Sequence, residues 1–110
     1  MTADFLQGLK QSAGGSGPQL RLPVGTPPRA FLRPIAVSSD RMRDADVAQL
    51  TEWRNRFVDA FLTRFVNTDD RTRKWLSEYV ANDDTRVLFM VDLPDGTTIG
   101  YMGLAYIDWN

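Results

Sequence analysis

From residue 30 onward, the hydrophobic and polar positions alternate between the period of a strand and the period of a helix. Residues 30–36 form a short extended run in which Pro34 indicates an edge strand or the end of a strand. Apolar residues then recur at steps of three and four over residues 47–62, as on the buried face of an amphipathic helix. Asp44 or Asp46 is suited to cap the N-terminus of that helix. The pattern therefore predicts a strand followed by a helix.

A second helix and a pair of strands are predicted in the rest of the chain. Thr68 is placed to cap a helix that runs to about residue 82. Residues 86–92 have the composition of a buried strand and residues 98–108 that of a return strand, and Gly96 in the turn between them provides a positive φ. The order β-α-α-β-β predicts an α/β domain with an antiparallel hairpin rather than a repeat of βαβ units.

Residues 1–28 differ in composition from the rest. They are rich in glycine, serine and proline from residue 11 onward, which favours a flexible or disordered N-terminal tail. The alternative is that Phe5, Leu6 and Leu9 form a turn of amphipathic helix that docks on the main body. On the first interpretation, the folded domain occupies residues 29–110.

The last predicted strand is unusually apolar and carries no charge before Asp108. Pairing with the preceding strand satisfies only one of its two edges, and an uncharged open edge invites association. We therefore expect a further strand to pair with it. That strand would come from additional sequence, from a second copy in a homodimer, or from another complementing chain.

Composition excludes several classes of chemistry. The chain of 110 residues has 13 basic and 14 acidic residues, so its formal net charge of −1 gives no general attraction to nucleic acid or to anionic membranes. The basic cluster of Arg71, Arg73 and Lys74 is flanked by acidic residues, as on a solvated, ion-paired surface. Nucleic acid is therefore not an expected partner.

The chain contains neither cysteine nor histidine. This excludes disulfides, thiolate nucleophiles, imidazole bases, and metal sites built from thiolate or imidazole ligands. The longest apolar run, Val87–Val91, is too short to span a membrane, and the N-terminus has no signal pattern. These observations predict a cytoplasmic protein with no membrane partner.

Three stretches, taken in order, resemble the N-terminal half of a GCN5-related N-acetyltransferase (GNAT). Phe31–Ile35 is similar to the "LRP" motif of the opening strand of that family. Glu52–Asn55 is similar to the "WRN" motif on the first helix of the branch that acts on ribosomal-protein N-termini and amino sugars. Ile99–Leu104, followed by Ile107 and Asp108, is similar to the third strand of that branch. The resemblance covers about residues 30–110.

The resemblance implies a partial GNAT fold, with an antiparallel sheet and helices packed on it. It also implies transfer of acetyl from acetyl-coenzyme A to a primary amine of a small molecule, an amino sugar or a protein N-terminus. The cofactor loop of the family, Arg/Gln-x-x-Gly-x-Gly/Ala, does not occur in this sequence, and Gly14–Gly17 has no strand before it. We therefore expect the chain alone to be inactive. The alternative is a non-catalytic interaction module or remnant that pairs through its last strand.

The same resemblance suggests residues that bind the acceptor. Trp53, Arg54 and Asn55 lie on the helix that borders the acceptor pocket in the family. The alternative is that Trp53 belongs to the core and that Arg54 pairs locally, with Glu52 or with Asp59. Two further candidates, Phe61 and Phe65, fall near the loop after this helix, although the pattern favours the alternative that they pack one helix against the next.

Two residues near the end of the chain complete the set of candidates. Tyr101 and Tyr106 face opposite sides of the predicted strand because side chains alternate with a period of two. Tyr106 is the one expected to face the pocket, because clefts form near strand ends. Asp108 is the candidate acid–base residue of a chain without histidine, the alternative being a solvated strand end. No metal site is expected.

Overall fold

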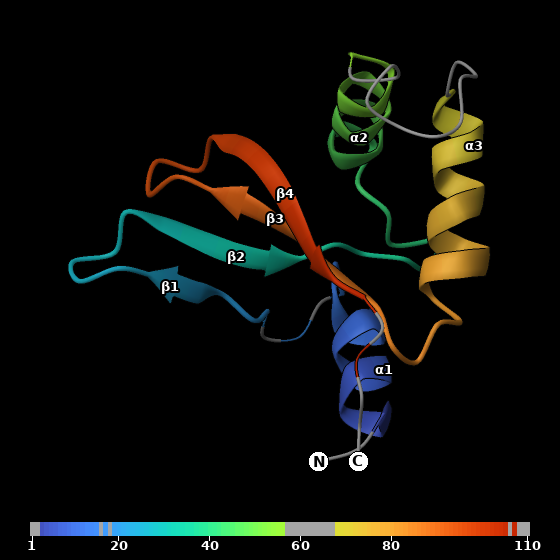
Figure 1. The fold of residues 1–110 in the computed structure, drawn as a ribbon, viewed down its shortest axis with the longest axis horizontal. Helices are drawn as coiled ribbons and strands as arrows, with labels where there is room; N and C mark the ends of the chain where they lie inside the picture. Colours follow the sequence, from blue (N-terminus) through green and yellow to red (C-terminus); the bar gives the residue numbers. More distant parts are fainter. Residues whose placement is uncertain (1–2, 16, 18, 57–67, 106, 108–110) are drawn as a thin grey trace.

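The computed structural model describes residues 3–15, 17, 19–56, 68–105 and 107 (Figure 1). Two elements, helix α1 (Ala3–Ser12) and strand β1 (Leu22–Val24), precede the predicted domain. The remaining elements follow in the order β2 (Ala30–Pro34), α2 (Asp44–Arg56), α3 (Asp69–Lys74), β3 (Val87–Asp92) and β4 (Thr98–Leu104). Helix α3 continues directly into a π-helical segment, η2 (Trp75–Val80). The predicted β-α-α-β-β order is therefore present.

The strands form one antiparallel sheet in the order β1-β2-β3-β4. Met90 on β3 lies opposite Arg33 on β2 and Tyr101 on β4, so these three side chains share one face. The register between β3 and β4 shifts at Val91/Asp92. This arrangement confirms a small α/β domain built on an antiparallel sheet, whereas its relation to the GNAT fold stays a prediction.

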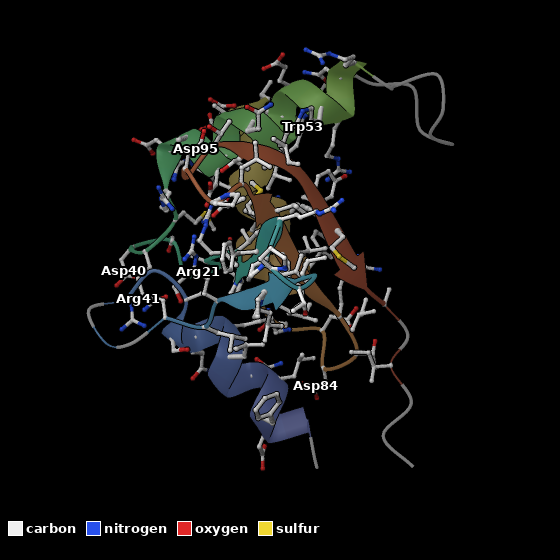
Figure 2. The ribbon with its side chains drawn as sticks, turned by 90° about the vertical axis from the view of Figure 1, so that its left-hand side faces the viewer. Arg21, Asp40, Arg41, Trp53, Asp84 and Asp95 are labelled. Carbon is white, nitrogen blue, oxygen red and sulfur yellow. The ribbon has the colours of Figure 1, made fainter. Side chains whose placement is uncertain are left out.

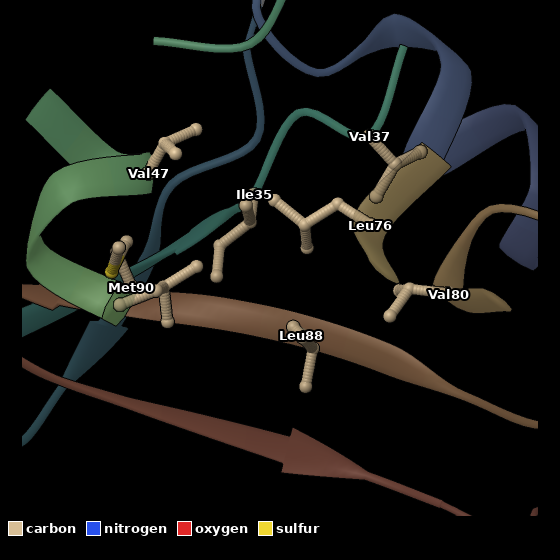
Figure 3. Packing of buried hydrophobic residues seen from close by; sticks show 8 residues of the cluster. Ile35, Val37, Val47, Leu76, Val80, Leu88 and Met90 are labelled. Atoms are coloured by element: carbon tan, nitrogen blue, oxygen red, sulfur yellow. The ribbon is translucent and has the colours of Figure 1, made fainter. Parts of the chain in front are cut away.

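Helices cover both faces of β3. Leu88 and Met90 point toward α2 and η2 and join a core cluster that also includes Ile35, Val37, Val47, Leu50, Leu76 and Val80 (Figure 3). Val87 and Phe89 point the other way and pack with Leu6 of α1. Alternate residues of a strand face opposite sides, so a strand that is buried on both faces needs an unbroken apolar run. Residues 87–90 provide that run.

The N-terminal segment is not the flexible tail that composition favoured. Ala3–Ser12 form the helix of the alternative interpretation, with Leu6 buried against the sheet, and Leu22–Val24 add a strand beside β2. The folded structure therefore begins well before residue 29. Docking of α1 provides the apolar burial that its composition alone did not indicate.

The glycine-rich stretch after α1 is closed by one side chain. The carboxamide nitrogen of Gln19 donates to the carbonyls of Ser12, Gly15 and Gly17, and its oxygen accepts from the N–H of Gly14 at 2.9 Å. Gly14 has a φ of +77°, a conformation that favours glycine. These glycines therefore lie in a hydrogen-bonded turn with a defined backbone conformation, and not in a flexible linker.

Several local predictions are confirmed. The Thr68 hydroxyl accepts from the N–H of Arg71 at 3.2 Å and caps α3, as predicted. Gly96 in the 93–97 turn has a φ of +93°, and Pro34 is the last residue of its strand. Pro34 does not mark an edge, however, because β1 and β3 both pair with β2.

Among the described strands, β4 has one paired and one open edge (Figure 1). Its apolar side chains Ile99, Met102 and Leu104 are 54%, 43% and 53% exposed. An open edge on the last predicted strand is therefore confirmed within this part of the chain. The strand that would pair with it stays a prediction.

Candidate functional site

The last turn of α2 contacts β4 through a pair of aromatic rings. The rings of Trp53 and Tyr101 are stacked, with centroids 5.7 Å apart and an interplanar angle of 18°. Both side chains are half-buried and lie against the apolar core cluster (Figure 2 labels Trp53). Trp53 therefore belongs partly to the core, as the simpler alternative held, and it also presents part of a flat apolar surface.

The neighbouring Arg54 packs on a different aromatic ring. Its guanidinium carbon lies 4.4 Å from the centroid of Trp75, which begins η2, so the pair joins α2 to the following helix. Of the two local partners in the alternative interpretation, Glu52 forms an ion pair with Arg56 instead, and Asp59 lies outside the described residues. Asn55, the third predicted residue of this turn, is half-buried.

A charged network lies on the same face of the sheet. The Arg33 guanidinium makes two hydrogen bonds with the carboxylate of Asp46, at 2.8 and 3.1 Å, and a third with Asp92 at 2.9 Å. The hydroxyl of Thr98 donates to the other oxygen of Asp92 at 2.7 Å. The arginine of the "LRP" stretch thereby joins β2 to α2 and β3, and Asp92 in turn joins β3 to β4. No local pattern in the sequence indicates this network.

The environment of this network favours the charged forms. Burial by itself raises the pKa of Asp92, but hydrogen bonds from Arg33 and Thr98 outweigh it, so the pKa lies below its usual value. Burial alone would lower the pKa of Arg33, yet the Asp46 and Asp92 carboxylates raise it above the usual range. Groups that stay ionised in this way are suited to hold elements together rather than to exchange protons.

The structure brings together three of the predicted residues, Trp53, Arg54 and Asn55, on one helical turn. Phe61, Phe65, Tyr106 and Asp108 lie outside the described residues. The tyrosine that faces the helices is Tyr101. The sequence prediction was Tyr106 instead, because the period of a strand does not say which of its two sides faces the helices.

The glycines of the N-terminal turn do not fit a pyrophosphate site. The N–H of Gly14 donates to Gln19 and the N–H of Gly15 to the carbonyl of Ser12, so both donors are already used. Within the described residues, no strand leads into a glycine-rich turn that opens a helix. These residues therefore provide no place for the diphosphate of acetyl-coenzyme A.

The described part of the chain contains neither a cluster of metal ligands nor a helix that could span a membrane. There, no group of three or more acidic, histidine or cysteine side chains is placed to hold a metal ion. None of its helices has the length and apolar character required to cross a bilayer.

No protein-family model, curated protein or solved structure matches this chain.

Proposed function

We propose that this chain forms the acceptor-binding half of a GNAT-type N-acetyltransferase. The contact between Trp53 and Tyr101 supports this proposal most directly, because it joins two of the three family-like stretches. The third stretch, Phe31–Ile35, lies in the same antiparallel sheet and extends into the same core through Ile35. The observed β-α-α-β-β order agrees with the proposal.

In the proposed reaction, a primary amine attacks the thioester carbonyl of acetyl-coenzyme A. A C–N bond forms, the C–S bond breaks, the proton of the ammonium passes to a base, and the thiolate leaves and is protonated. The described residues would bind and orient the amine: Trp53 and Tyr101 form an apolar wall and Arg54 a donor group beside it. Asp108 stays the proposed base. We assign no residue to acetyl-coenzyme A, because the described residues do not fit its diphosphate.

The test is acetyl transfer to amines, followed by mass spectrometry. The panel contains amino sugars, a polyamine and peptides with a free N-terminus. The chain alone should be inactive. A longer protein, translated from the same gene past Asn110, should transfer acetyl if the added residues include a strand and the Arg/Gln-x-x-Gly-x-Gly/Ala loop. Turnover by the chain alone would contradict the proposal that it holds only the acceptor-binding half of the active site. A longer protein that contains the loop and acetylates no amine would contradict the proposal that this chain is part of an N-acetyltransferase.

Variants of the active longer protein test the role of the aromatic pair. Tyr101→Ala should raise the KM for the amine about tenfold and leave the KM for acetyl-coenzyme A unchanged, because the lost contact faces only the acceptor. Tyr79→Ala is the matched control, since Tyr79 is 63% exposed on η2. Equal changes in both KM values for Tyr101→Ala would show a general structural effect instead.

The open edge of β4 supports a second candidate, an interaction module without catalysis. In this case the edge pairs with a strand of a second copy or of another chain. Light scattering should then show a dimer that dissociates on dilution, and Met102→Lys should weaken it by placing a charge on the open strand. Tyr79→Lys, away from the sheet, should leave the dimer intact. A monomer at every concentration would exclude self-association through β4.

A further inference from the structure

A second site is indicated by a cavity that shares no residue with the Trp53 region. It has a volume of about 330 Å³ and lies between α1, the loop at residues 37–40 and the end of η2. Side chains with neutral polar groups dominate its wall: Gln7, Gln11, Ser38, Ser39, Ser77 and Asn82. Its volume is in the range of small-molecule sites, which begin at about 300 Å³.

Two charged side chains hold the walls of the cavity in place. The Lys10 ammonium of α1 donates to the carbonyls of Val80 and Asp83, both at 2.7 Å, and so fixes α1 to the end of η2. The Arg41 guanidinium donates to the carbonyl of Gln11, which joins the loop to the same helix. Figure 2 shows Asp40 and Arg41 beside the C-terminal end of α1. The cavity is therefore formed before any ligand arrives.

The charges around the cavity disfavour an anion. The third proton of the Lys10 ammonium is donated to the carbonyl of Arg86 at 3.0 Å, so all three of its donors are used. Lys10 is only 1% exposed, and the remaining charged group of the lining is the carboxylate of Asp40. A phosphate or carboxylate would meet this negative charge with no free cation among the lining residues to offset it.

The remaining polar groups are suited to hydroxyl groups. No hydrogen bond joins the side chains of Gln11, Ser38 or Ser39 to another residue in the described part of the chain. Serine hydroxyls and carboxamides each donate and accept, as sugar hydroxyls do, and a ligand with several hydroxyls can satisfy them together. We propose that this cavity binds a small, uncharged polyhydroxylated ligand, such as a monosaccharide.

The test is an NMR titration of the ¹⁵N-labelled chain with D-glucose. Backbone amide signals of Gln11, Ser38, Ser39 and Ser77 should shift together and saturate, and those of Trp53 and Tyr101 should not change. Inorganic phosphate at the same concentration should shift none of them. The absence of saturable shifts with glucose would overturn the proposal. Equal or stronger shifts with phosphate would also overturn it, because they would identify an anion site.

Two variants separate this cavity from non-specific surface binding. Gln11→Ala should weaken glucose binding roughly fivefold, the effect of losing one neutral hydrogen bond. Ser39→Trp should abolish binding by filling the cavity from an exposed position, where folding is tolerant of change. Gln49→Ala, which removes a carboxamide from α2, should leave binding unchanged. Undiminished binding by Ser39→Trp would place the glucose elsewhere and refute the assignment.

Discussion

The ammonium of Lys10 lies 2.7 Å from the carbonyl oxygen of Val80, although the two residues are 70 positions apart. The last carbonyls of a helix have no partner within it and carry the negative end of its dipole, so a cation is well placed there. Burial lowers the pKa of Lys10, and the nearby charges of Asp83 and Asp84 oppose that change. The first helix is thus attached to the end of η2 by a buried charge.

Removing this charge should release α1. In Lys10→Met the side chain keeps its approximate size, but the buried carbonyl of Val80 and the part-buried carbonyls of Asp83 and Arg86 lose the ammonium as a donor. We expect the free energy of unfolding in urea to fall by about 2–3 kcal/mol. Lys74→Met is the control, because Lys74 is exposed, and it should change stability by less than about 0.5 kcal/mol. Similar values for both variants would show that Lys10 does not hold α1 in place.

The Arg33 network should be sensitive to loss of its cation. Arg33→Met leaves the carboxylates of Asp46 and Asp92 close together and nearly buried, with side-chain exposures of 7% and 14%. We expect a loss of about 3 kcal/mol in thermal or chemical denaturation. Arg29→Met, an exposed arginine at the start of β2, should have little effect.

The same network predicts part of the acid sensitivity of the fold. Because the pKa of Asp92 is lowered on folding, its ionised form stabilises the protein fully above the unfolded value of 3.8. This contribution should disappear as the pH falls through the lower, folded pKa. Asp92→Asn should therefore flatten the dependence of stability on pH below about 4. Asp40→Asn, in an exposed loop, should keep the wild-type slope; equal slopes for all three proteins would contradict the assignment.

Two glycines of β4 should respond differently to alanine. A Cβ on Gly103 would lie 2.4 Å from Cδ2 of Leu88 and 3.0 Å from the carbonyl of Val87, whereas one on Gly100 meets nothing within 4 Å. We expect Gly103→Ala to cost about 1–2 kcal/mol and Gly100→Ala almost nothing. The cost of Gly103→Ala should be smaller when Leu88→Val is also present, since the clash is relieved. Strict additivity would exclude this contact as the cause.

Two threonines form a buried hydroxyl pair between α2 and α3, and replacing one should cost more stability than replacing the other. The Thr51 hydroxyl donates to the carbonyl of Val47, so the 2.7 Å contact with Thr72 is donated by Thr72. Thr72→Val removes that donor and should cost about 1 kcal/mol. Thr51→Val should cost more, because it leaves the Thr72 hydroxyl without its acceptor at a residue that is 0% exposed. If urea denaturation showed a larger loss of stability for Thr72→Val than for Thr51→Val, Thr51 would be the donor of this hydrogen bond instead.

Local signals in the sequence were sufficient for much of the fold. The cap at Thr68, the positive φ at Gly96 and the buried run of β3 depend on residues close to one another in the chain. The α1 helix was harder to foresee, because its stability comes from partners near residues 80–89. The glycine-rich composition around Gly14 also predicted a flexible segment, although the side chain of Gln19 holds the backbone there in a turn.

The candidate site was predictable only in part. The stripe of α2 and the family-like motif placed Trp53 and Arg54 on one turn, which the structure confirms. Their partners, Tyr101 and Trp75, depend on how β4 and η2 pack against α2, and periodicity does not specify such packing. For the same reason, no local pattern indicated that Arg33 would meet Asp46 and Asp92.

The attachment of α1 through Lys10 has a consequence for protein synthesis. The carbonyls that accept from Lys10 are translated 70–76 residues after it. At a synthesis rate of about 5–20 residues per second, the first helix must wait roughly 4–15 s before its docking surface exists. During that time Leu6 and Leu9 have no sheet to cover. The nascent chain therefore exposes a short apolar segment until the residues that cover it have been synthesised.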